Sequence, residues 1–119
     1  MQLRGLADEP LRLRPFEVVR FDGARSVAGV LTGGVVKDFN VIFDAALCSA
    51  DLSFREGTGV ATCGSRATLL ANVGVPPCNC EQGGESARLA RHDAVLIAGD
   101  AGSALRWRDA ERVALVRID

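Results

Sequence analysis

The sequence has one histidine, His92, and one lysine, Lys37, among its 119 residues, and its formal net charge is -1. These numbers exclude a metal site built from several histidines of one subunit. They also exclude a strongly basic surface for nucleic acid or a membrane. No stretch approaches the roughly 18 uninterrupted apolar residues that a membrane-spanning helix needs. The first ten residues contain acidic side chains and no apolar core, so we expect no secretory signal there.

The composition fits a compact, loop-rich protein, because 48% of the residues are hydrophobic and 13 are glycine. Without a signal or a membrane span, we expect a cytoplasmic protein whose four cysteines stay reduced. The length suits one domain, which we expect to cover residues 1–119. No internal repeat or linker interrupts the chain.

Short apolar or alternating runs, which are typical of β-strands, recur at about ten-residue spacing and are separated by Gly, Pro and Asp turns. The runs cover residues 11–14, 16–21, 26–31, 39–43, 52–55, 58–62, 68–73, 94–98, 105–108 and 112–118. Only residues 43–48 and 85–91 fit a helical turn. The pattern therefore predicts an all-β fold, an antiparallel sandwich or barrel.

The last strand has apolar residues on both of its faces. Val113 and Leu115 alternate with Ala114, Val116 and Ile118, so both faces should be covered. We favour a core strand over the alternative, a strand pressed against another subunit. Trp107 lies between two arginines and should be a core aromatic with arginines on the surface side.

Three motifs resemble the HutD/Ves family. They are a Phe21-Asp22-Gly23 turn, a Leu31-Thr32-Gly33-Gly34 segment and an Asp38-Phe39-Asn40-Val41-Ile42 block. The resemblance implies a cupin-like jelly roll and a link to bacterial histidine utilisation. The Trp-Lys-Asn-Gly-Gly-Gly motif of the family's amino-terminal half does not occur here, so the chain resembles the carboxy-terminal half. A half without its partner half would expose apolar surface, which predicts a homodimer.

Asp38 and Asn40 are the best candidates for ligand contacts. In a strand, residues two apart share a face, while Phe39 would point to the core. A carboxylate beside an amide suits a small polar ligand with ammonium, formimino or imidazole groups, and Lys37 lies next to this pair. The alternative is structural, because Asp and Asn also bind backbone amides in turns.

The histidine and the cysteines lie in sequence patterns that do not point clearly to a catalytic or metal site. His92 sits in a predicted turn beside an aspartate, so we expect an exposed histidine, with a general base or pH sensor as the alternative. Cys78 and Cys80 form a C-x-C pair, with Cys48 and Cys63 scattered upstream. That spacing differs from zinc knuckles, so incidental thiols are favoured over a metal or redox site. We expect no cofactor and no metal.

Three functions remain open at this point. The first is a non-enzymatic cupin-like protein that binds a small polar ligand, such as a histidine-pathway metabolite, or regulates that pathway. The second is a metal-independent isomerase or hydrolase that uses Asp38 and His92. The third is a half-domain that needs a partner chain. Neither nucleic acid nor a membrane is expected as a partner.

Overall fold

The computed structural model describes residues 1–34 and 36–119. Their contacts divide into two compact units, Met1–Ile42 and Phe43–Asp119. Every regular element in these described residues is a β-strand, so the all-β prediction is confirmed. The expectation of one cupin-like domain over residues 1–119 stays a prediction. No helix among the described residues is long and apolar enough to cross a membrane.

The first unit contains a small antiparallel sheet. Its strands are β1 (Gln2–Arg4), β2 (Leu11–Arg12) and β3 (Ala28–Val30), in the order β2-β1-β3. The strand expected over residues 16–21 does not form. Phe16 has a φ of 64°, and the N–H of Glu17 donates to the carbonyl of Arg14 at 3.2 Å. A turn therefore interrupts the extended chain at this point.

The second unit is a larger antiparallel sheet in which β9 is the central strand. Its neighbours on one edge are β5 and β6, and β4 pairs along its other edge. The strands are β4 (Ala50–Thr62), β5 (Ala67–Asn72), β6 (Cys78–Gln82), β7 (Glu85–Leu89), β8 (Ala94–Ala98) and β9 (Ala104–Ile118). The outer strands are β7, beside β6, and β8, beside β5.

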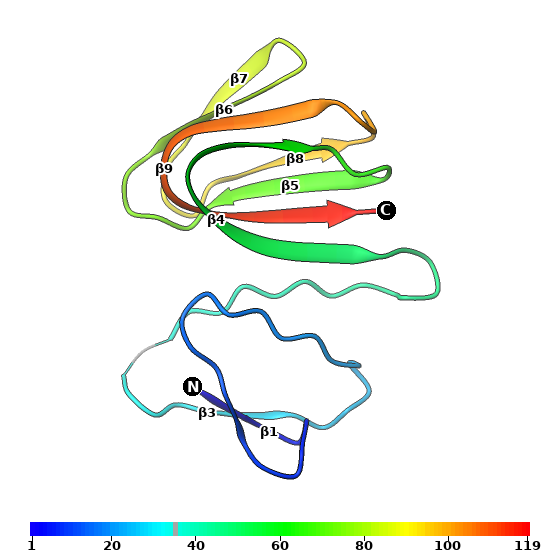
Figure 1. The fold of residues 1–119 in the computed structure, drawn as a ribbon, viewed down its shortest axis with the longest axis vertical. Helices are drawn as coiled ribbons and strands as arrows, with labels where there is room; N and C mark the ends of the chain where they lie inside the picture. The colour runs from blue at the N-terminus through cyan, green and yellow to red at the C-terminus, as the bar shows by residue number, and fades with distance from the viewer. Residues whose placement is uncertain (35) are drawn as a thin grey trace. The chain divides into compact units, whose positions relative to one another are not determined.

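Strand β9 changes partner halfway along its length. Its first half pairs with β6 and its second half with β5. Between the halves, Asp109 has a φ of 59°, and β4 shifts register on both sides of Gly57, whose φ is 74°. Irregularities of this kind bend a strand. Both long strands therefore curve and fold the sheet into two layers, as Figure 1 shows for the orange-to-red β9 and the green β4.

The core lies inside this bend. Trp107 and Leu105 come from the first half of β9, Val113 and Leu115 from the second, and each is at most 1% exposed. Ala114 and Val116, on the other face of β9, are also buried. The prediction that the last strand is covered on both faces is therefore confirmed, and so is the core position of Trp107.

Two further local predictions differ from the structure. Residues 85–91 were expected to form a helical turn, but Glu85–Leu89 is strand β7, which pairs with β6 across Gly83 and Gly84. Residues 39–43 were expected to form a strand and have none. A strand needs a hydrogen-bonded neighbour, and no described strand pairs with this segment.

Candidate functional site

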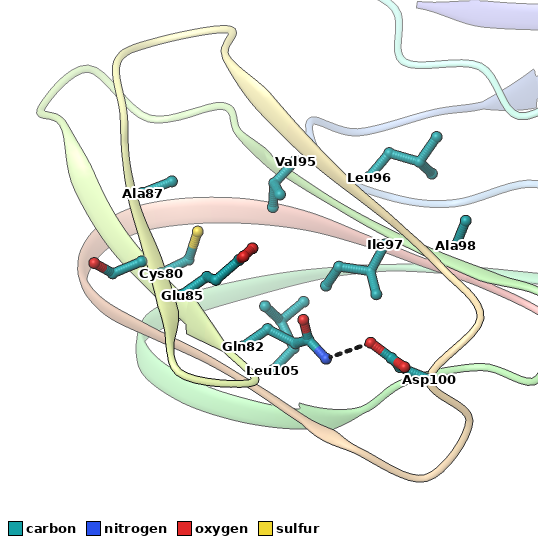
Figure 2. Close-up of a pocket in the computed structure, with 11 residues that line it drawn as sticks. Cys80, Gln82, Glu85, Ala87, Val95, Leu96, Ile97, Ala98, Asp100 and Leu105 are labelled. Carbon is teal, nitrogen blue, oxygen red and sulfur yellow. Dashed lines mark hydrogen bonds between the residues drawn. The ribbon is translucent and has the colours of Figure 1, made fainter.

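A cavity of about 280 Å³ opens in the second unit between the two outer strands of the folded sheet. Its walls come from β6, β7, β8, the start of β9 and the turn after β8. Figure 2 shows polar side chains on one side of this cavity and the aliphatic side chains of β8 opposite them. We call it the seam cavity.

Strand alternation directs the side chains of β6 toward the seam cavity. Cys78 and Cys80 are buried and Gln82 is half-buried, whereas Asn79 and Glu81 between them are exposed. Gln82 is the last residue of β6. The Gly83-Gly84 turn, with φ values of 59° and 80°, brings Glu85 directly opposite it. Local hairpin geometry thus places an amide and a carboxylate side by side.

Gln82 is anchored by two hydrogen bonds. Its Nε2 donates to Oδ2 of Asp100 at 3.1 Å and to Oγ of Ser103 at 3.0 Å. A carboxylate only accepts hydrogen bonds, which fixes the amide nitrogen toward Asp100. Both amide hydrogens are used in this way, so the amide presents its carbonyl oxygen, an acceptor, to the rest of the cavity.

The turn that carries Asp100 is itself fixed by the backbone. Gly99, Asp100 and Gly102 have φ values of 79°, 56° and 82°. The N–H of Ser103 donates to the carbonyl of Asp100 at 3.0 Å, and the N–H of Gly102 donates to the carbonyl of Cys63 at 3.2 Å. Aspartate and glycine tolerate this left-handed backbone better than most residues. The backbone of this turn therefore fixes the position of Asp100 in the polar wall.

The opposite wall is apolar. Val95 is half-buried and Ile97 is buried, and both line the cavity; the buried Leu105 lines it on the other side, beside its strand partner Gln82. Cys80 also lines the cavity. Burial raises the pKa of the Cys80 thiol, although the backbone N–H of Ala87 opposes that rise. Such a thiol is protonated near neutral pH and behaves as a small apolar group.

The other cysteines do not gather into a reactive group. All four are free; Cys63, Cys78 and Cys80 are buried and Cys48 is half-buried. Burial raises the pKa of Cys78, and the nearby Cys80 raises it further. Among the described residues, no group of three or more His, Cys, Asp or Glu side chains is arranged to hold a metal ion.

The residues predicted from sequence lie elsewhere. Lys37, Asp38 and Asn40 are exposed in the first unit, and Phe39 between them is half-buried, although the segment forms no strand. The seam cavity is lined wholly by residues of the second unit. The role of these three side chains as ligand contacts therefore stays a prediction.

His92 is exposed in the turn between β7 and β8, as the sequence suggested. Its φ is 71°, and its N–H donates to the carbonyl of Asn72 at 2.8 Å. It does not line the seam cavity. Its alternative roles, as a general base or a pH sensor, stay predictions.

The sequence pattern does not single out Gln82, Glu85 and Asp100, because Gln82 and Asp100 lie in Gly-rich turn segments and Glu85 begins the run that fits a helical turn. One signal was present: Cys78, Cys80 and Gln82 alternate with polar residues at the period of a strand. Gln82 and Asp100 are 18 residues apart, however, and only the folded sheet brings them together.

Comparison with known proteins identifies a family. The model of the HutD family matches residues 1–115. No curated protein and no solved structure matches the sequence.

Proposed function

Because the chain belongs to the HutD family, we propose that it binds a small polar ligand in the seam cavity and acts without catalysis in histidine utilisation. The observation that carries this proposal is the anchored Gln82 amide, held by Asp100 and Ser103 at the edge of a cavity of about 280 Å³. Cavities near this size hold small molecules when a few fixed polar groups face an apolar wall.

The chemistry of the cavity favours binding over nucleophilic catalysis. Its thiol, Cys80, has a pKa raised by burial, and a protonated thiol is a poor nucleophile. No imidazole lines the cavity. The alternative enzyme would use Asp38 and His92 and would turn over its substrate. A loss of that turnover in an Asp38→Ala variant would favour the enzyme.

A second candidate site is the segment with Lys37, Asp38 and Asn40. All three side chains are exposed, and together they offer a cation, a carboxylate and an amide to a ligand. Variants of the two sites distinguish them, because each removes polar groups from one unit only.

The proposal includes a cytoplasmic location and a homodimer. Large apolar side chains remain exposed in both units, such as Ile42 at 94% and Leu96 at 64%. Covering such groups favours association. The third alternative, a half-domain that needs a different partner chain, predicts that a second protein copurifies with this one.

Thermal-shift measurements with histidine, urocanate, formiminoglutamate and glutamate test the proposal. A ligand that binds the native state raises the melting temperature by mass action. We expect stabilisation without turnover and its loss in Gln82→Leu. The matched control is Glu81→Gln, on the exposed face of the same strand, which should respond like the wild type. Stabilisation that survives Gln82→Leu contradicts the seam cavity as the binding site.

A further inference from the structure

We propose that the seam cavity selects small organic cations, that is, ligands that pair an ammonium or similar N–H-bearing cation with an apolar or aromatic body. This inference rests on the proposed function, because it assumes that the cavity binds a ligand. It adds the charge and the hydrogen-bonding character of that ligand.

The polar wall of the cavity offers acceptors. The Gln82 amide donates both of its hydrogens, to Asp100 and Ser103, so only its carbonyl oxygen is available to a ligand, as an acceptor. Glu85 and Asp100 contribute carboxylates, which only accept hydrogen bonds when ionised. A ligand that satisfies these groups must bring donors.

The cavity also has an unbalanced charge. Two carboxylates line it, and no lysine or arginine is among its lining residues. The Glu85 carboxylate forms no hydrogen bond or ion pair with any of the residues that the structure describes, whereas the Asp100 carboxylate accepts from Gln82. Figure 2 shows the Glu85 carboxylate directed into the cavity, between the polar wall and the aliphatic wall. An anionic ligand would be repelled by this pair, and a cation would be attracted.

The apolar wall defines the rest of the ligand. Val95 and Ile97 face the polar groups across the cavity, whereas Leu105, the strand partner of Gln82, adds an aliphatic side chain beside that amide. An apolar or aromatic body can pack against these aliphatic side chains while its cationic end reaches Glu85. A fully hydrated metal cation or a plain ammonium ion would leave that wall uncovered.

Three imidazole compounds that differ in charge test the inference by calorimetry at pH 8. Histamine carries an ammonium, 4-hydroxymethylimidazole is neutral and urocanate carries a carboxylate. We expect histamine to bind most tightly and urocanate most weakly. In Glu85→Gln, histamine affinity should fall about threefold to tenfold, a range suited to one partly exposed charge pair. Affinity for the neutral compound should stay within about twofold, because it loses no charge pair.

Glu81→Gln is the matched control, because Glu81 is one residue before Gln82 and points to the exposed face. It changes the net charge equally and should leave all three affinities unchanged. Two results would contradict the proposed selection of cations and leave the ligand site itself in place. One is that urocanate binds as tightly as histamine, and the other is that Glu85→Gln and Glu81→Gln lower the affinity for histamine equally. If none of the three compounds and none of the four histidine-pathway compounds binds, the proposed function itself fails.

Discussion

Trp107 occupies the space that a side chain at Gly59 would fill. The two residues are paired across β4 and β9, and a Cβ at position 59 would lie 2.7 Å from Cε2 of the indole. Trp107 is 1% exposed, and its N–H is buried without an acceptor among the described residues. Packing against the glycine backbone therefore holds this ring in place.

Replacing Gly59 with alanine should destabilise the protein. The added methyl group cannot fit without moving the indole, and overpacking of this kind costs about 1–3 kcal/mol. Urea unfolding monitored by the fluorescence of the single tryptophan measures the change. Gly23→Ala is the control, because a Cβ there would meet nothing within 4 Å. Equal stability of the Gly59→Ala variant and the wild type would contradict the packing argument.

Asn72 should be essential for stability although it lies outside the seam cavity. Its fully buried side chain donates to the carbonyls of Pro76 and Leu89 at 2.9 and 3.0 Å and accepts from the N–H of Gly74 at 2.9 Å. Asn72→Ala leaves these backbone groups without their partner, at a cost of about 1–3 kcal/mol for each buried group left unpaired. Chemical denaturation measures the loss. Asn79→Ala, at an exposed position of β6, should change stability little; similar losses in both variants would refute this role.

Stability should fall as the pH rises above about 9. Burial raises the pKa values of Cys78 and Cys80 above the ordinary value of 9.0. The thiols of the unfolded chain therefore lose their protons at a lower pH than those of the folded protein. Their contribution to the free energy of unfolding is complete below the unfolded-state pKa, and it is lost as the pH rises through the pKa of the folded state. Urea midpoints between pH 7 and about 10, in reducing buffer, test this. The absence of tyrosine and the single lysine keep other titrations few.

The alanine variants at the cysteines separate this effect from general alkaline unfolding. Cys80→Ala should reduce the pH dependence, whereas Cys48→Ala should leave it unchanged. A midpoint that stays constant across the range would show that the two buried thiols do not matter to stability.

The two candidate binding sites make opposite predictions for one pair of variants. If the ligand lies in the seam cavity, Gln82→Leu abolishes ligand-induced stabilisation and Asp38→Ala preserves it. If the ligand contacts Lys37, Asp38 and Asn40, the reverse holds. Thermal shift with the same ligand at the same concentration distinguishes the two results, and the wild type provides the reference.

Light scattering tests the proposed homodimer. The expected mass is twice the 12.6 kDa of one chain, because exposed apolar side chains such as Leu96 and Val60 favour self-association. A mass of one chain at high micromolar concentration would contradict the homodimer. A larger complex with another protein would favour the half-domain alternative instead.

The strands that could be predicted from sequence are those with a clear apolar pattern between turns. The run at residues 94–98 coincides with β8. The sequence predicts two strands over residues 105–108 and 112–118, because polar residues separate the two apolar runs, but they belong to one bent β9. The sequence pattern does not indicate strands β6 and β7, because most of their residues are polar and Leu89 is their only large apolar side chain.

The candidate site was harder to predict than the fold. Alternation alone predicts that Cys80 and Gln82 share a face, but not what that face meets. The contact of Gln82 with Asp100 depends on how β9 bends and on which strands then face each other. Residues 39–43 show the converse case. Their local pattern predicts a strand, but no described strand pairs with them, so none forms.

The partner change within β9 has a consequence for how this protein folds and for how truncation would affect it. One continuous strand is shared by both layers, and its final residue, Ile118, pairs with Ala50 at the start of β4. Contacts between such distant parts of the chain form slowly, because a long loop must close before they are gained. Strands β4, β5 and β6 all pair with β9, so neither layer is complete until this last strand has joined the sheet. Truncation within β9 should therefore unravel both layers together and leave aggregation-prone edges rather than a smaller folded core.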